Sequence, residues 1–279
     1  MSALVEPSEA FANAYPYAPA TLRHALADHP LFTLDRLAAL TERHPEDRLE
    51  YNRGDLGLTQ DPDAMPANGL GAAETVRTIE ANGSWMVVKN VERDPDYARL
   101  MDQCLDALAP VTGPATGPRH QAEAFVFLSS PGSLTPFHMD PEHNVLCQLR
   151  GTKTMAVYPR DGLVAQETRE AFHLGAHRNL VHEPRFDAEA ETFELAAGDA
   201  LHVPLLAPHW VRNGPEVSVS FSITWRSALS VAEADTHRAN AWLRARLGRW
   251  GLSPRPPGGP MDGAKRAGYK VLRRAGLAR

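Results

Sequence analysis

Two histidines and one aspartate form the clearest chemical pattern in this sequence. His138 and Asp140 are separated by one residue, and in an extended strand residues two apart point to the same face. His209 follows the strand-like stretch Leu-His-Val-Pro further along the chain. Two imidazoles and one carboxylate on one side of a metal, with open positions opposite, are the facial triad of non-haem Fe(II) oxygenases. The three residues therefore indicate a metal centre, although a His-x-Asp pair alone is more often part of a surface strand.

A lysine on the following predicted hairpin strengthens this interpretation. Residues 144–150 are predicted as a strand, Gly151-Thr152 as a turn, and residues 153–158 as the returning strand. Such a hairpin brings Lys153 back toward the strand that carries His138. Its ammonium group could there meet an anionic co-substrate, because a carboxylate removed from water needs a charged partner.

These motifs resemble those of the JmjC-type, cupin-like hydroxylases that depend on Fe(II) and 2-oxoglutarate, among them the asparaginyl hydroxylases. The resemblance covers roughly residues 125–226 and is strongest in T-P-F-H-M-D-P-E-H-N followed by Q-L-R-G-T-K. The later stretch G-D-A-L-H-V-P-L-L-A-P-H-W also fits the family pattern. The resemblance implies that Fe(II) is held by His138, Asp140 and His209.

The same resemblance assigns the co-substrate. It implies that Thr135 and Lys153 bind the distal carboxylate of 2-oxoglutarate and that Asn144 lies near its metal-chelating end. In asparaginyl hydroxylases a polar amide on the last strand also reaches the co-substrate. The nearest counterpart in this chain is Ile223, which is a departure from the family pattern.

The activity implied is a dioxygenase that hydroxylates a C–H bond of a protein side chain or a small molecule, consuming O₂ and releasing succinate and CO₂. A modified tRNA base is a further possible substrate. Two other classes of function stay open. The chain could be a non-catalytic cupin module that binds a metal or ligand as a sensor. It could also be a cupin isomerase or ring-cleaving dioxygenase that works without 2-oxoglutarate, for which Lys153 would not be needed.

Other possible ligands are interpreted as structural. Glu142 and His143 follow Pro141, which interrupts the strand and places them on a loop. His202 lies within a predicted strand and is given no role. The insert 160–191 carries three more histidines whose spacing fits no standard metal site, so it is predicted to be a solvated loop. These three are His173, His177 and His182.

The elements that must position these residues predict a mainly β protein with flanking helices, a double-stranded β-helix of the cupin or jelly-roll type. We expect an N-terminal α/β elaboration packing on the barrel (1–119), a JmjC-like cupin barrel (120–229) and a basic helical extension (230–279). Barrel strands are predicted at 124–129, 192–195, 200–203 and 217–225, besides the ligand strand and the hairpin. In the N-terminal part the pattern predicts helices at 34–40, 74–81 and 95–108, strands at 50–52 and 85–88, and loops at 57–72 and 111–119.

Composition is that of an ordinary globular protein. With 279 residues, 43% of them hydrophobic, the chain can bury a full core. A net charge of −5 favours neither nucleic acid nor membrane binding, and no apolar run approaches the roughly 20 residues that span a bilayer. The N-terminus does not resemble a secretory signal. Cys104 and Cys147 are predicted to be buried thiols, which fits a cytoplasmic location.

The C-terminal part combines an apolar stripe with basic charge. Residues 233–252 are predicted as a helix, and we expect it to form a homodimer, although packing on the barrel is the alternative. Its stripe consists of Ala239, Trp242, Leu243, Leu247 and Trp250. From Arg238 onward there are 11 Lys and Arg and one acid. Such a tail could dock on the acidic body or hold an acidic or RNA partner. Nucleic acid is the less favoured partner because residues 265–279 contain one aromatic side chain, Tyr269, for base stacking.

Overall fold

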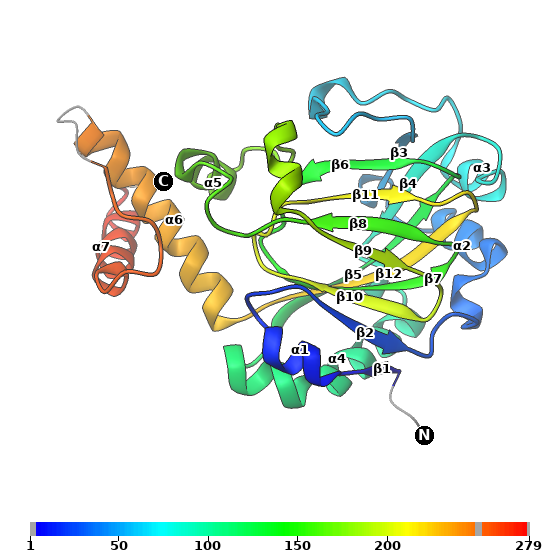
Figure 1. Ribbon diagram of the computed structural model, residues 1–279, viewed down its shortest axis with the longest axis horizontal. Coiled ribbons are helices and arrows are strands. Elements are labelled where there is room, and N and C mark those ends of the chain that lie inside the picture. The colour runs from blue at the N-terminus through cyan, green and yellow to red at the C-terminus, as the bar shows by residue number, and fades with distance from the viewer. Residues whose placement is uncertain (1–3, 249–252, 278–279) are drawn as a thin grey trace.

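The structure, a computed structural model, describes residues 4–248 and 253–277 and contains two antiparallel sheets (Figure 1). The larger sheet has the strand order β1 (Val5–Glu6), β2 (Ala20–His24), β10 (Asp199–Val203), β7 (His143–Arg150), β12 (Ser218–Arg226), β5 (His120–Ser129), β4 (Ser84–Lys89), β3 (Leu49–Arg53). The smaller sheet has the order β6 (Leu134–His138), β11 (His209–Asn213), β8 (Lys153–Val157), β9 (Glu191–Leu195). The predicted mainly β, double-stranded β-helix fold is confirmed.

Apolar side chains from both sheets meet between them. Leu146 and Val203 of the larger sheet share a buried cluster with Met155, Val157 and Val211 of the smaller one. Because side chains alternate along a strand, each sheet can bury one face in this cluster and turn the other outward. The two layers thereby form a sandwich whose interior also contains the polar residues described below.

The outer face of the larger sheet is covered by helix α4 (Pro95–Thr116), as Figure 1 shows. Along β12, Val219, Phe221 and Ile223 point into the core that α4 helps to form. Ser220 and Ser222 point to the opposite face, where they bond to polar groups of β7. The alternation of serine and apolar residues along this strand thus separates the supporting core from the barrel interior.

The N-terminal part adds β1, β2, β3 and β4 to the larger sheet, together with α1 (Glu9–Ala14), α2 (Leu34–Thr41) and α3 (Ala72–Arg77). The predicted helix at 34–40 is confirmed, and Thr33 caps it by accepting a hydrogen bond from the Arg36 backbone N–H. The strands expected at 50–52 and 85–88 are β3 and β4. The helix expected at 74–81 is α3, displaced toward the N-terminus. The division of the chain at residues 119 and 229 stays a prediction.

The loop predicted at 111–119 is wrong up to residue 116, because α4 continues to Thr116. Pro110 and Pro114 lie inside the helix, where each removes a backbone hydrogen bond and crowds the preceding turn. The buried hydroxyls of Thr112 and Thr116 donate hydrogen bonds to the carbonyls four residues earlier. Their burial against the core stabilises helical turns that the proline content argues against.

The insert after β8 is also more ordered than predicted. It contains α5 (Gln166–His173) and a short 3-10 helix (Pro184–Glu189). The face that α5 buries carries Arg169 and Glu170, and Glu170 accepts two hydrogen bonds from Arg244 at 2.8 and 2.9 Å. A helix that buries charged residues gives no apolar periodicity, which explains why the sequence pattern did not reveal it.

Two C-terminal helices extend from the barrel, α6 (Ala228–Leu247) and α7 (Asp262–Arg274), visible beside α5 in Figure 1. Helix α7 packs against α6, where Tyr269 and Leu272 meet Ala239 and Trp242. Trp250, part of the predicted stripe, lies outside the described residues. Cys104 and Cys147 are buried free thiols, as predicted. Among the described residues, none of the helices has the length and apolar character needed to cross a bilayer.

Candidate metal centre and co-substrate pocket

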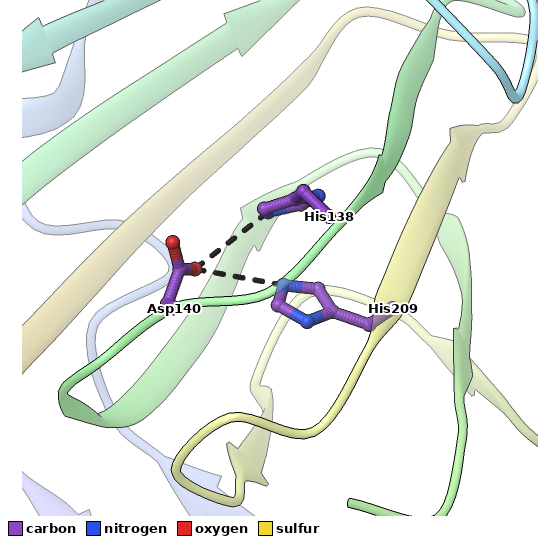
Figure 2. Close-up of side chains that lie close together, drawn as sticks. All are labelled: His138, Asp140 and His209. Atoms are coloured by element: carbon purple, nitrogen blue, oxygen red, sulfur yellow. Dashed lines mark ion pairs between the residues drawn. The ribbon is translucent and has the colours of Figure 1, made fainter. Parts of the chain in front are cut away.

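His138, Asp140 and His209 converge on one point (Figure 2). Their potential ligand atoms all lie within 4.8 Å of one another. The Asp140 Oδ2 atom is 3.6 Å from Nε2 of His138 and 3.7 Å from Nε2 of His209. The two histidines are direct cross-strand partners, because His209 of β11 lies opposite His138 of β6. Strand pairing therefore sets the separation of the two imidazoles.

Both imidazoles are oriented by the backbone. Nδ1 of His138 is 2.7 Å from the carbonyl oxygen of Pro136, and Nδ1 of His209 is 3.0 Å from that of Ala207. A carbonyl oxygen only accepts, so each Nδ1 carries the proton and donates it. Each Nε2 then presents a lone pair toward Asp140. This arrangement, with the second ring nitrogen donating to a carbonyl, is the one that metal-bound histidines use.

Asp140 does not lie within the same strand as His138, although the sequence pattern predicted that it would. Strand β6 ends at His138, so Asp140 lies just beyond the strand rather than within it. The insert pairs with this segment through a bridge between His138 and Asn179. Arg178 of the same insert is 3.4 Å from Oδ1 of Asp140, the oxygen that faces away from the imidazoles. One carboxylate oxygen thus has a cationic partner, and the other remains free for a metal.

The protonation states favour metal binding. Burial, together with the nearby His209, lowers the pKa of His138 to about 3. Burial also lowers the pKa of His209. For Asp140, burial alone would raise the pKa, but His138, Arg178 and His209 outweigh it and the pKa lies below the usual value. Neutral imidazoles and an ionised carboxylate are the forms that bind a cation, so the three side chains fit the divalent metal that the sequence implies.

The metal-centre cavity extends from these ligands into the barrel. Its lining includes all three predicted co-substrate residues, Thr135, Asn144 and Lys153. Lys153 is the first residue of β8 and pairs with Asn213, at the end of β11 remote from His209. Asn213 is four residue steps from His209, or about 13 Å of backbone. Lys153 and the triad therefore line the same cavity, with Lys153 beside one end of β11 and His209 at the other.

Lys153 is buried, with 4% of its surface exposed, and no carboxylate among the described residues pairs with it. Burial lowers its pKa to about 7. An unpaired buried ammonium is costly unless an anion occupies the cavity.

Thr135 and Asn144 have their acceptor atoms occupied. The hydroxyl of Thr135 accepts a hydrogen bond of 3.0 Å from Nε1 of Trp85. Oδ1 of Asn144 accepts one of 2.8 Å from the hydroxyl of Ser222. The hydroxyl proton of Thr135 and the amide protons of Asn144 remain available for another acceptor. With Lys153, these residues give the cavity an excess of donors.

The residue of β12 that bonds to a lining residue of this cavity, Asn144, is Ser222 rather than Ile223. Ile223 is fully buried in the core on the α4 side of the larger sheet. Ser222 points to the interior and orients Asn144. The polar residue of β12 on the interior face, Ser222, therefore lies one position before the expected counterpart, Ile223.

His143 and His202 do not line the metal-centre cavity. His143 is the first residue of β7, not part of a loop as expected, and its Nε2 lies 2.9 Å from the Ser227 hydroxyl. His202 packs against Phe11 and Tyr15. Among the described residues, the triad is the one group of metal-ligand type, so the three histidines of the insert do not form a second cluster.

Two wall residues of the cavity were missed by sequence reasoning. Trp85 comes from β4 in the N-terminal part, and Arg178 comes from the insert. Both also line an adjoining hollow that contains Glu50 and His177. Neither lies within the motif-bearing region near Thr135, so local spacing carries no signal for them.

The comparisons with known proteins agree with this geometry. The sequence model of the Cupin-like domain matches residues 35–230. The chain belongs to this cupin-like family. Jumonji C domain-containing protein 5 of Drosophila melanogaster is 32% identical over 110 residues, 34% of this chain and 26% of that protein. Lysine-specific demethylase 8 of Danio rerio is 32% identical over 104 residues, 34% of this chain and 25% of that protein.

The matches to these relatives thus span about a quarter of their length. Among solved structures, this cupin-like chain is similar to YcfD, a ribosomal oxygenase from Escherichia coli in complex with cobalt and 2-oxoglutarate. The TM-score is 0.51 at 15% identity, covering 98% of this chain and 69% of YcfD. This similarity shows a shared fold, and the JmjC-type resemblance inferred from the motifs is confirmed.

Proposed function

We propose that this protein is an Fe(II)- and 2-oxoglutarate-dependent dioxygenase that hydroxylates a C–H bond of a protein side chain or small molecule. One observation carries the proposal: a facial set of two imidazoles and a carboxylate shares a cavity with an unpaired buried lysine. Bound Fe(II), with 2-oxoglutarate and O₂, would supply the oxidation of the C–H bond, with succinate and CO₂ as co-products. The residues of the chain supply the binding and orientation.

Each named residue has a distinct part in the proposal. His138 and His209 would hold Fe(II) through Nε2, and Asp140 would hold it through Oδ2. Lys153 pairs with the distal carboxylate of 2-oxoglutarate, and Thr135 donates to the same group.

Asn144, held by Ser222, presents its amide protons toward the metal-chelating end. The compact ammonium group of Lys153 suits the single distal carboxylate of 2-oxoglutarate in a narrow interior.

Anaerobic titration with Fe(II), with and without 2-oxoglutarate, tests the assignment. We expect the weak visible charge-transfer band of the chelate in the wild type and its loss in His209→Ala. Succinate formation coupled to O₂ uptake then separates an enzyme from a non-catalytic cupin module. A charge-transfer band of normal strength in His209→Ala would refute the ligand set. Turnover that does not require 2-oxoglutarate would favour the isomerase or ring-cleaving alternative.

The names of the relatives, a demethylase and a ribosomal oxygenase, support a protein substrate as the first candidate to screen. Mass spectrometry of candidate substrates for a gain of one oxygen atom is the direct assay. A mass gain confined to small molecules would remove the protein substrate from the proposal. A cytoplasmic location and nucleic acid as an unlikely partner stay predictions from sequence.

A further inference from the structure

A second cavity, of about 590 Å³, lies between the insert after β8, helix α6 and the chain leading into α7. Figure 1 shows these elements together on one side of the barrel. The cavity shares no lining residue with the metal-centre cavity or its adjoining hollow. Its polar lining includes Arg160, Gln166, Arg169, Glu233, His237 and Arg266.

Arg169 is the central observation. Its side chain is 1% exposed, yet its Nε and Nη2 have no hydrogen-bond partner among the described residues. Its remaining nitrogen, Nη1, lies 3.7 Å from the exposed carboxylate of Asp161. Nε and Nη2 form one edge of the guanidinium, and this edge can bind a carboxylate or phosphate through two parallel hydrogen bonds. Buried donors without acceptors are rare in folded proteins, since each costs free energy.

The neighbouring residue shows that the fold can pair buried charge here. Glu170 is also buried, and Arg244 of α6 donates two hydrogen bonds to its carboxylate. Arg169, one position earlier on the same helix, receives no equivalent partner. The difference lies in what each side chain faces, because Arg169 lines the cavity and Glu170 does not.

The other charged groups leave the cavity with spare donors rather than spare acids. Arg160 gives Nη2 to Glu233 and its Nε lies 3.3 Å from Asp161, while its Nη1 has no partner among the described residues. Asp262 accepts hydrogen bonds from the backbone of Gly258 and Gly259 and pairs with Lys265. The acids are thus already engaged, while one edge of the Arg169 guanidinium and Nη1 of Arg160 have no acceptor among the described residues.

We propose that this cavity binds a small organic anion, whose carboxylate or phosphate group is held by Arg169 and Arg160. The volume falls in the usual range for small-molecule sites, about 300–1,000 Å³. The site is separate from the metal centre, so it is independent of the proposed oxygenase activity. A ligand there would contact both α5 and α6 and so join the insert to the C-terminal helices.

Calorimetric titration of the full chain with inorganic phosphate and, separately, with citrate tests the site and distinguishes its two possible anions. We expect at least one of them to bind in the millimolar range or tighter. Arg169→Lys keeps the charge but removes the two-pronged edge, so it should weaken binding about tenfold or more. Arg185→Lys, an exposed arginine of the same insert, is the matched control and should leave binding unchanged.

Thermal unfolding of each variant without ligand separates loss of the site from loss of the fold. Lys153→Ala separates this cavity from the metal-centre cavity and should bind the probe as the wild type does. The proposal is overturned if neither anion binds, or if a folded Arg169→Lys binds as the wild type does. It is equally overturned if the binding is lost in Lys153→Ala.

Discussion

At the scale of single residues, Lys153 is the side chain on which the proposed co-substrate binding depends most. Replacing it with alanine removes a charge-assisted contact to a buried carboxylate. We expect the KM for 2-oxoglutarate to rise roughly 30- to 1,000-fold, corresponding to about 2–4 kcal/mol, with Fe(II) affinity little changed. Thr135→Ala should have a smaller effect, because a neutral hydroxyl is lost. Steady-state kinetics with varied 2-oxoglutarate measure both, and an unchanged KM in Lys153→Ala would favour a binding module or isomerase.

The same lysine predicts a pH dependence. Burial lowers its pKa to about 7, so the ammonium form is present below that pH and is lost above it. Binding of an anion requires the charged form and must therefore take up a proton at higher pH. We expect the affinity for 2-oxoglutarate to fall about tenfold per pH unit above about pH 7. Calorimetry in buffers of different ionisation enthalpy measures the proton uptake directly, and binding at alkaline pH without proton uptake would contradict the prediction.

Arg178 supports the aspartate of the triad. It pairs with Oδ1 of Asp140 and thereby keeps Oδ2 turned toward the imidazoles. Loss of such a supporting contact typically lowers metal affinity about 10- to 100-fold, and we expect Arg178→Met to behave this way. Fe(II) titration measures the change. His177→Ala, at an exposed neighbouring position, is the control, and equal iron affinity in Arg178→Met and wild type would show that the pair is not needed.

The triad and the three proposed co-substrate residues, which line one cavity, could be predicted from sequence because each lies in a short motif. Trp85, Arg178 and Ser222 could not. Trp85 and Arg178 come from segments whose approach to the cavity depends on long-range packing. Ser222 differs from the expected Ile223 by one strand position, which reverses the face of the sheet, and a local alternating pattern does not reveal which face is inside.

At the scale of elements, the strands were predicted better than the helices. Their apolar runs and glycine or proline turns mark β5, β7 and β8 clearly, whereas β11 was not predicted as a strand, although its first residue, His209, was predicted as a ligand. Helix α4 was cut short because prolines normally end helices, and α5 was missed because its buried face is charged. In both helices the tertiary contacts outweigh the local preference.

The end of α4 allows a stability test. Tyr15 and Thr116 are both buried, and their hydroxyls lie 2.9 Å apart. Since the Thr116 hydroxyl donates to the carbonyl of Thr112, it accepts from Tyr15. Thr116→Val leaves the Tyr15 hydroxyl proton without its acceptor and should lower the free energy of unfolding by about 1–3 kcal/mol. Chemical denaturation of Thr116→Val, Tyr15→Phe and the double variant measures the coupling between the two hydroxyls. Additive changes in the free energy of unfolding would refute the coupling.

At the scale of the whole molecule, the oligomeric state stays a prediction. The homodimer was predicted through residues 233–252, but α7 of the same chain covers part of that helix at Ala239 and Trp242. Packing within the chain is thus observed for this part of the stripe. Light scattering of the full chain, compared with a version ending at Ser230, tests the prediction. A monomer at tens of micromolar would rule the dimer out.

The pairing of His138 with His209 also has a consequence for folding. Their strands, β6 and β11, are not consecutive in the chain. The contact between the two histidines therefore closes a long loop that contains the hairpin and the insert. A nascent chain that stops before His209 contains two of the three ligands and no site. The three ligands of the proposed metal site are therefore together only once the smaller sheet has closed.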